Sequence, residues 1–162
     1  MNESATKVMR ARRDFERLVP RPWNRETFLA NLGEHRGRPV SLISVETVQR
    51  GTPCGLWLAY ADHDEIVYDR DTSDYHVDHT ILHEVGHMVL DHRCEDRESG
   101  LVTIQRLLPD IDTARIEKVL GRSHFDDQQE SEAEMFADLL MEGSYSPYRR
   151  SAPMTSLWGS RA

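Results

Sequence analysis

The chain has few cysteines and no long apolar run. Its two cysteines, Cys54 and Cys94, lie outside any CxxC pattern, so neither a disulfide framework nor a cysteine cage for zinc is expected. The N-terminal residues are charged throughout and contain no apolar stretch long enough for a signal peptide or a membrane span. We therefore expect a cytoplasmic protein that makes no membrane contact.

An excess of positive charge is also missing. The formal net charge is −8 at pH 7, and phosphate contacts need clustered Lys and Arg, so direct nucleic-acid binding is not expected. A length of 162 residues suits one domain and is short for two. We expect a single domain over residues 1–142. Residues 143–162, rich in Ser, Pro and Arg, are expected to form a disordered tail.

The pattern of apolar residues predicts an α+β fold. Residues 5–18 and 24–35 are typical of helices, with Asn24 capping the second. Three short runs rich in β-branched and aromatic residues follow, separated by Gly, Pro and Asp. We expect these runs to form a small antiparallel sheet; they cover residues 39–45, 55–60 and 65–68.

The second half of the chain is predicted to be helical. Residues 74–91 carry apolar side chains around most of the circumference, which indicates a buried helix. After a polar stretch and a short amphipathic piece, a further helix is expected to begin at Asp112 and to end at Gly121. The last strong helical pattern covers residues 127–142.

The buried helix contains an HExxH pattern, His83-Glu84-Val85-Gly86-His87. Residues four apart on a helix differ by only about 40° around the axis, so both imidazoles can share one tetrahedral zinc ion. Glu84 lies about 100° from His83, where a carboxylate can take a proton from bound water without being a ligand. Chance alone gives HExxH at a probability of about a few per cent, but two histidines buried on an apolar helix need a strong partner.

A catalytic zinc site takes three protein ligands, so a third residue is needed. The HExxHxxGxxH pattern is not completed, because Leu90 and Arg93 stand at the positions of its glycine and third histidine. On a continuous helix His92 would point about 140° away from His87. We therefore expect the third ligand to come from another helix.

The last predicted helix offers three glutamates. Glu132 shares the core-facing arc with Phe136, whereas Glu134 lies on the solvent side. Asp127 followed by Glu130 resembles a capping box, which gives Glu130 another explanation. We rank Glu132 first as the third ligand and Glu130 second.

Two positions near the histidines stay open. His79 lies four residues before His83, where it is either an outer partner of the site or a polar residue near the helix start. Asp91 lies four residues after His87, where it either accepts the ring N–H of that histidine or is exposed at the helix end.

A helix reading LHEVGHMVLDH followed by one reading ESEAEMFADLLM resembles the ImmA/IrrE family of zinc metallopeptidases. The resemblance covers about residues 40–142. It implies a minimal zincin-like fold, with a small antiparallel sheet packed on the HExxH helix and a glutamate-bearing helix. It also implies that His83, His87 and Glu132 bind zinc and that Glu84 is the general base.

Characterised members of that family cleave helix-turn-helix repressors that control stress-response or mobile-element genes. The resemblance therefore implies a protein substrate of this kind. The chain departs from the family pattern at Glu134, where Asn is frequent, and at Glu142, where Pro is frequent. The alternative function is a regulatory or toxin-like binding module in which the zinc site is only structural.

Overall fold

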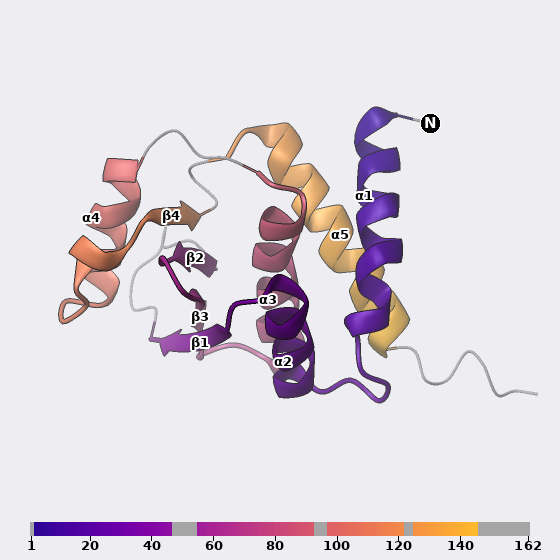
Figure 1. Cartoon of the computed structure of the whole chain (residues 1–162), viewed down its shortest axis with the longest axis horizontal. Helices are drawn as coiled ribbons and strands as arrows, with labels where there is room; N and C mark the ends of the chain where they lie inside the picture. The colour runs from indigo at the N-terminus through magenta and orange to yellow at the C-terminus, as the bar shows by residue number, and fades with distance from the viewer. Residues whose placement is uncertain (1, 47–54, 93–96, 122–124, 146–162) are drawn as a thin grey trace, which may run out of the picture.

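A computed structural model of the chain describes residues 2–46, 55–92, 97–121 and 125–145. Within these ranges the chain is an α+β domain, as the sequence predicts, and it contains five α-helices and one four-stranded sheet (Figure 1). None of the helices in the described part is long and apolar enough to cross a membrane. Cys54, Cys94 and most of the predicted tail lie outside the described residues.

The helices and strands follow the apolar pattern closely in the first half of the chain. The side chain of Asn24 accepts a hydrogen bond from the Thr27 N–H (2.8 Å) and begins the second helix, as predicted. The last helix continues three residues beyond the predicted boundary at residue 142. The helices are α1 (Glu3–Phe15), α2 (Arg25–Arg36), α3 (Asp74–Val89), α4 (Arg97–Leu107) and α5 (Asp127–Tyr145). The strands are β1 (Val40–Val45), β2 (Gly55–Ala59), β3 (Asp64–Asp69) and β4 (Lys118–Gly121).

The sheet is mixed, and the expectation of a purely antiparallel sheet is wrong. Its strand order is β1-β3-β2-β4, with β2 antiparallel to both β3 and β4. The β1 strand pairs in parallel with β3, with Val40 opposite Asp64. Because β2 pairs with one edge of β3 as a hairpin, β1 pairs with the other edge of β3. The alternation of apolar and polar residues within a strand does not specify its neighbour or whether the pairing is parallel.

The helix predicted from Asp112 to Gly121 is also wrong. The Asp112 side chain accepts a hydrogen bond from the Ala114 N–H (3.1 Å), but only a single 3₁₀ turn, η2 (Thr113–Arg115), follows. The chain then continues as β4, in which Val119 and Leu120 are buried in different core clusters. Pairing with β2 gives these two apolar residues opposite faces of a sheet, so the tertiary context overrides the helical pattern.

Helices cover both faces of the sheet (Figure 1). Trp57 and Ala59 of β2 pack into the larger core with side chains from α1, α2, α3 and α5. Leu56 and Leu58, which alternate with them along the strand, pack into a smaller core with α4. This arrangement holds α3, the helix with the HExxH pattern, between the sheet and the α1–α5 pair.

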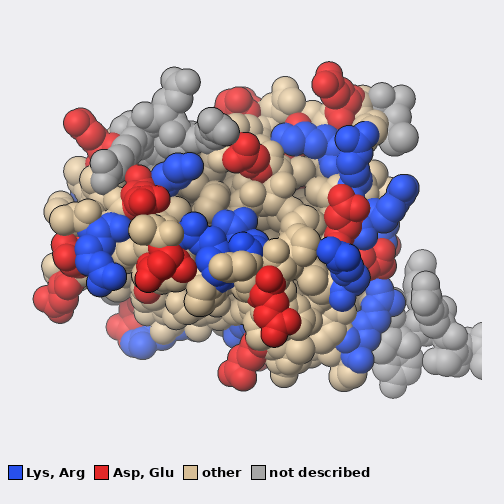
Figure 2. Space-filling model, viewed as in Figure 1, with Lys and Arg blue, Asp and Glu red and all other residues tan. Residues whose placement is uncertain are grey.

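The charged side chains on the face shown in Figure 2 are of both signs and interspersed. The α1 helix is rich in basic side chains, and the α5 helix against which it packs is rich in acidic ones. One ion pair between them is direct, because the Lys7 Nζ atom lies 2.9 Å from the Glu132 Oε2 atom. The most buried charge on α5 is therefore matched by α1.

Candidate metal centre

The two histidines of the HExxH pattern lie side by side on α3. Ser73 caps this helix, since its hydroxyl accepts a hydrogen bond from the His76 N–H (3.2 Å). The Nε2 atoms of His83 and His87 lie 3.1 Å apart. His87 is fully buried, whereas His83 keeps 12 % of its side chain exposed. The helical spacing thus places both rings on one face, as the sequence predicts.

A close contact between α3 and α5 brings a third residue, Glu130, to the two histidines. A Cβ atom on Gly86 would lie only 3.2 Å from both the Cα and the carbonyl oxygen of Ala133, so the two helices meet at backbone distance. Glu130 precedes Ala133 by one turn and shares its face of α5. The small residues at this crossing therefore allow Glu130 to reach the histidines.

Glu130 is the carboxylate that the structure places with the two histidines. Its oxygens lie 3.3 Å from His83 Nε2 and 3.3 Å from His87 Nε2. One ligand atom from each of these three residues lies within 4.8 Å of the others. A tetrahedral zinc ion with bonds of about 2.0–2.1 Å separates its ligand atoms by roughly 3.3–3.4 Å, so this donor set fits zinc.

The structure does not bring Glu132, our first choice of third ligand, into this group, where Glu130, the second choice, lies instead. Its Oε2 atom lies 2.9 Å from His92 Nε2 and 2.9 Å from Lys7 Nζ. Glu132 is buried, at 3 % exposure, as its position on the apolar arc predicts. However, α5 packs against α1 as well as α3, so it has two buried faces. Glu132 lies on the face toward α1.

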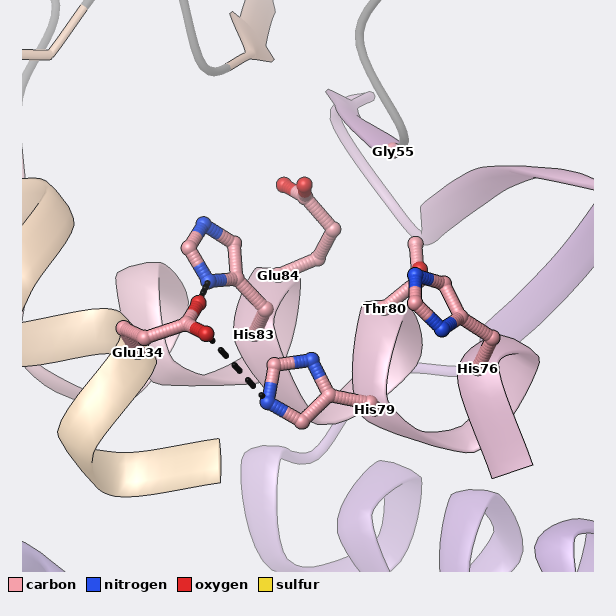
Figure 3. Close-up of a pocket in the computed structure, with 7 residues that line it drawn as sticks. All are labelled: Gly55, His76, His79, Thr80, His83, Glu84 and Glu134. Atoms are coloured by element: carbon pink, nitrogen blue, oxygen red, sulfur yellow. Dashed lines mark hydrogen bonds and ion pairs between the residues drawn. The ribbon is translucent and has the colours of Figure 1, made fainter. Parts of the chain in front are cut away.

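Glu84 faces an open pocket of about 140 Å³ beside His83. Figure 3 shows its carboxylate extended toward the space between His83 and Gly55. The side chain is 2 % exposed, and among the described residues its Oε2 atom has no hydrogen-bond partner. Burial raises the pKa of Glu84 to about 8. A carboxylate so placed can take up and release a proton near neutral pH.

A glycine at the start of β2 makes room for Glu84. A Cβ atom on Gly55 would lie 2.7 Å from Glu84 Oε1 and 2.7 Å from Thr80 Cγ2. Both contacts are shorter than real Cβ atoms tolerate, so a larger residue here would displace the Glu84 carboxylate. The strand thus forms one wall of the pocket.

The Nδ1 atoms of His83 and His87 have different partners, and His79 lies beside the partner of His83. His83 Nδ1 lies 3.2 Å from Glu134 Oε2, and His79 Nε2 lies 3.6 Å from Glu134 Oε1 (Figure 3). His79 Nε2 also lies 3.0 Å from Asp138 Oδ1. An acceptor at Nδ1 keeps the ring oriented with Nε2 toward the ligand group. His79 therefore lies beside the site, in contact with the residue that orients His83, rather than within the ligand group.

His87 is held by two residues that the sequence analysis did not select. Its ring stacks on Phe125, with centroids 3.7 Å apart, and its Nδ1 atom lies 2.9 Å from His92 Nδ1. The direction expected for His92 assumes that the helix continues to this residue. It does not, because α3 ends at Val89 and Asp91 adopts a left-handed φ of 52°. The His92 N–H then donates to the His87 carbonyl (3.0 Å), which folds the chain back over the site.

Asp91 forms this turn rather than orienting His87. Its side chain is exposed, and its N–H donates to the Met88 carbonyl (3.3 Å). Aspartate tolerates the left-handed conformation better than most residues, and this tolerance is the only sequence signal for the turn. The carboxylate predicted as one option for the His87 Nδ1 atom is thus replaced there by His92.

The charges of the group support a cation site. Burial lowers the pKa of His87 to about 4, so this imidazole is neutral. Burial alone would raise the pKa of Glu130, but the close His83 and His87 rings hold it at about 2. Burial opposes protonation of His83 as well, yet the carboxylates of Glu130, Glu84 and Glu134 raise its pKa. The group therefore combines a neutral imidazole with an ionised carboxylate, which suits a bound metal cation.

The helix crossing can be tested by filling it. Gly86→Val should destabilise the chain by about 1–3 kcal/mol, the usual cost of overpacking, and should weaken zinc binding by moving α5 and Glu130 away. Gly143→Val on α5 is the control, because a Cβ atom there meets only Arg21 Nη2 at 4.0 Å. Urea unfolding and zinc titration measure both effects. Equal stability and zinc affinity for the two variants would contradict the importance of the crossing.

Comparison with known proteins adds no family assignment. The chain matches no protein-family model, no curated protein and no solved structure. The resemblance to the ImmA/IrrE family therefore stays a prediction carried by two helical motifs, as does the zincin-like fold. The function has to be argued from the geometry of the site.

Proposed function

We propose that this chain is a zinc-dependent metallopeptidase. The observation that carries the proposal is the convergence of His83, His87 and Glu130, at distances that suit tetrahedral zinc, beside the buried carboxylate of Glu84. Three protein ligands leave a fourth position for water, and His83 and Glu84 line an open pocket on one side of the group. A site with an open position is typical of catalytic rather than structural zinc.

The residues divide into ligands, a base and orienting groups. A zinc ion held by His83, His87 and Glu130 would polarise a carbonyl group and make a bound water more acidic. Glu84 accepts a proton from the attacking water and later returns it to the departing amine. Glu134 holds the ring of His83 from the opposite side. This division of roles is that of a peptide hydrolase.

For the substrate we propose a helix-turn-helix repressor, which is what the resemblance to the ImmA/IrrE family implies. The reaction would take place in the cytoplasm, and the enzyme would need no DNA contact of its own. A net charge of −8 suits encounter with a basic DNA-binding protein. The chain would then switch genes by removing their repressor.

The proposal predicts both a stoichiometry and a product. The purified chain should hold about one zinc ion, and His83→Ala should hold much less. Co-expression with a repressor encoded beside it should give two fragments whose masses add up to the repressor plus one water. Elemental analysis and mass spectrometry measure these outcomes. A zinc-loaded chain that binds this repressor without cleaving it would instead support the regulatory binding module.

A further inference from the structure

Behind His87 lies a buried network of hydrogen-bonded side chains that the proposed reaction does not use. His87 Nδ1 lies 2.9 Å from His92 Nδ1, and His92 Nε2 lies 2.9 Å from Glu132 Oε2. His87, His92 and Glu132 are all at most 4 % exposed. Lys7 of α1 donates to Glu132 Oε2 (2.9 Å), and Gln128 donates to Glu132 Oε1 (3.2 Å). This network thus extends from the proposed ligand His87 to Lys7 of the N-terminal helix.

The partners at the far end fix the direction of every hydrogen bond. An ammonium group can only donate, so Glu132 accepts from Lys7 as an ionised carboxylate, which can only accept. His92 Nε2 must therefore carry a hydrogen and donate to Glu132. A neutral imidazole with hydrogen on Nε2 has a lone pair on Nδ1, so His92 accepts from His87.

The direction of these hydrogen bonds also determines which ring nitrogen of His87 carries a hydrogen. Because His87 donates through its Nδ1–H to His92, the Nε2 atom of a neutral His87 carries a lone pair. That atom is the one directed at His83 and Glu130. Stacking on Phe125 keeps the plane of the His87 ring in place.

We propose that His92 and Glu132 form a positioning relay that holds His87 in its Nδ1–H tautomer, so that Nε2 is free to bind metal. The inference rests on the proposed metal site and adds a role for α1, whose Lys7 fixes the far end of the relay. It also explains why a glutamate outside the ligand group is buried at this point. Without the relay, His87 can place its hydrogen on Nε2, where it blocks a ligand position.

The test compares His92→Gln with His92→Leu in the full chain. Glutamine can accept from His87 through its carbonyl oxygen while its amide donates to Glu132, so it keeps the direction of the relay. Leucine fills similar space but breaks both hydrogen bonds. In chelator competition, zinc affinity should fall by about 10–100-fold in His92→Leu and stay closer to wild type in His92→Gln. Leu32→Val, a core change on α2, controls for loss of stability.

The tautomer is measured without metal, from the ¹⁵N chemical shifts of the His87 ring. Wild type should show a protonated Nδ1 and an unprotonated Nε2, and His92→Leu should populate the other tautomer. A wild-type ring with hydrogen on Nε2 overturns the relay, and so does a His92→Leu variant with unchanged tautomer and affinity. If wild type holds the expected tautomer but binds no zinc, the metal function fails while the relay stands.

Discussion

Glu130→Gln should remove zinc from the purified chain, whereas Glu132→Gln should still bind about one ion at saturating zinc. The expected difference follows from the two faces of α5. Glu130 lies 3.3 Å from a ring nitrogen of each histidine, while Glu132 faces His92 and Lys7. A neutral amide lacks the charge that makes a carboxylate a zinc ligand, so the change at Glu130 removes one of three ligands.

The two variants should also differ in affinity. Loss of an outer partner costs about 10–100-fold in metal affinity, so Glu132→Gln should stay within that range and Glu130→Gln should exceed it. Elemental analysis after dialysis and chelator competition measure the two quantities. Glu142→Gln, an exposed change on the same helix, is the control and should match wild type. Retention of zinc by Glu130→Gln with loss from Glu132→Gln would return the ligand role to Glu132.

The sequence predicts the elements of the site better than their contacts. The α3 and α5 helices, the shared face of His83 and His87, and the burial of Glu132 all follow from helical periodicity. Periodicity also shows which arc of α5 is buried, but not which neighbour covers which part of it. The small side chains of Ala133 and Ala137, aligned with Glu130 and matched by Gly86 on α3, are the signal that selects Glu130.

The remaining errors have the same origin, because each depends on contacts between distant parts of the chain. Val119 and Leu120 have a spacing that suits a helix, and only the neighbouring β2 strand makes them part of a sheet. The parallel pairing of β1 with β3 depends on which side of β3 the β2 hairpin leaves open. His92 reaches His87 because the helix ends two residues earlier than predicted, at a left-handed Asp91.

Glu84→Gln should abolish turnover while leaving zinc binding and folding nearly unchanged. Glutamine keeps the size of the side chain in the space beside Gly55 but cannot accept a proton from water. General-base catalysis is typically worth about 10²–10⁴-fold, so cleavage of a protein substrate should slow by at least that factor. Zinc content should stay at about one ion per chain, because the structure places Glu84 outside the ligand group.

The stability of Glu84→Gln gives an independent check on the raised pKa of Glu84. Burial raises the pKa of Glu84 to about 8, so the folded chain disfavours its charged form, and a neutral amide avoids that cost. The free energy of unfolding of metal-free Glu84→Gln should therefore equal or exceed that of wild type, as urea titration would show. Glu142→Gln, exposed and far from the pocket, should leave both turnover and stability unchanged. If Glu84→Gln instead controls its partner protein as well as wild type does, cleavage is not how this chain acts, and the binding module with a structural zinc site becomes the better account.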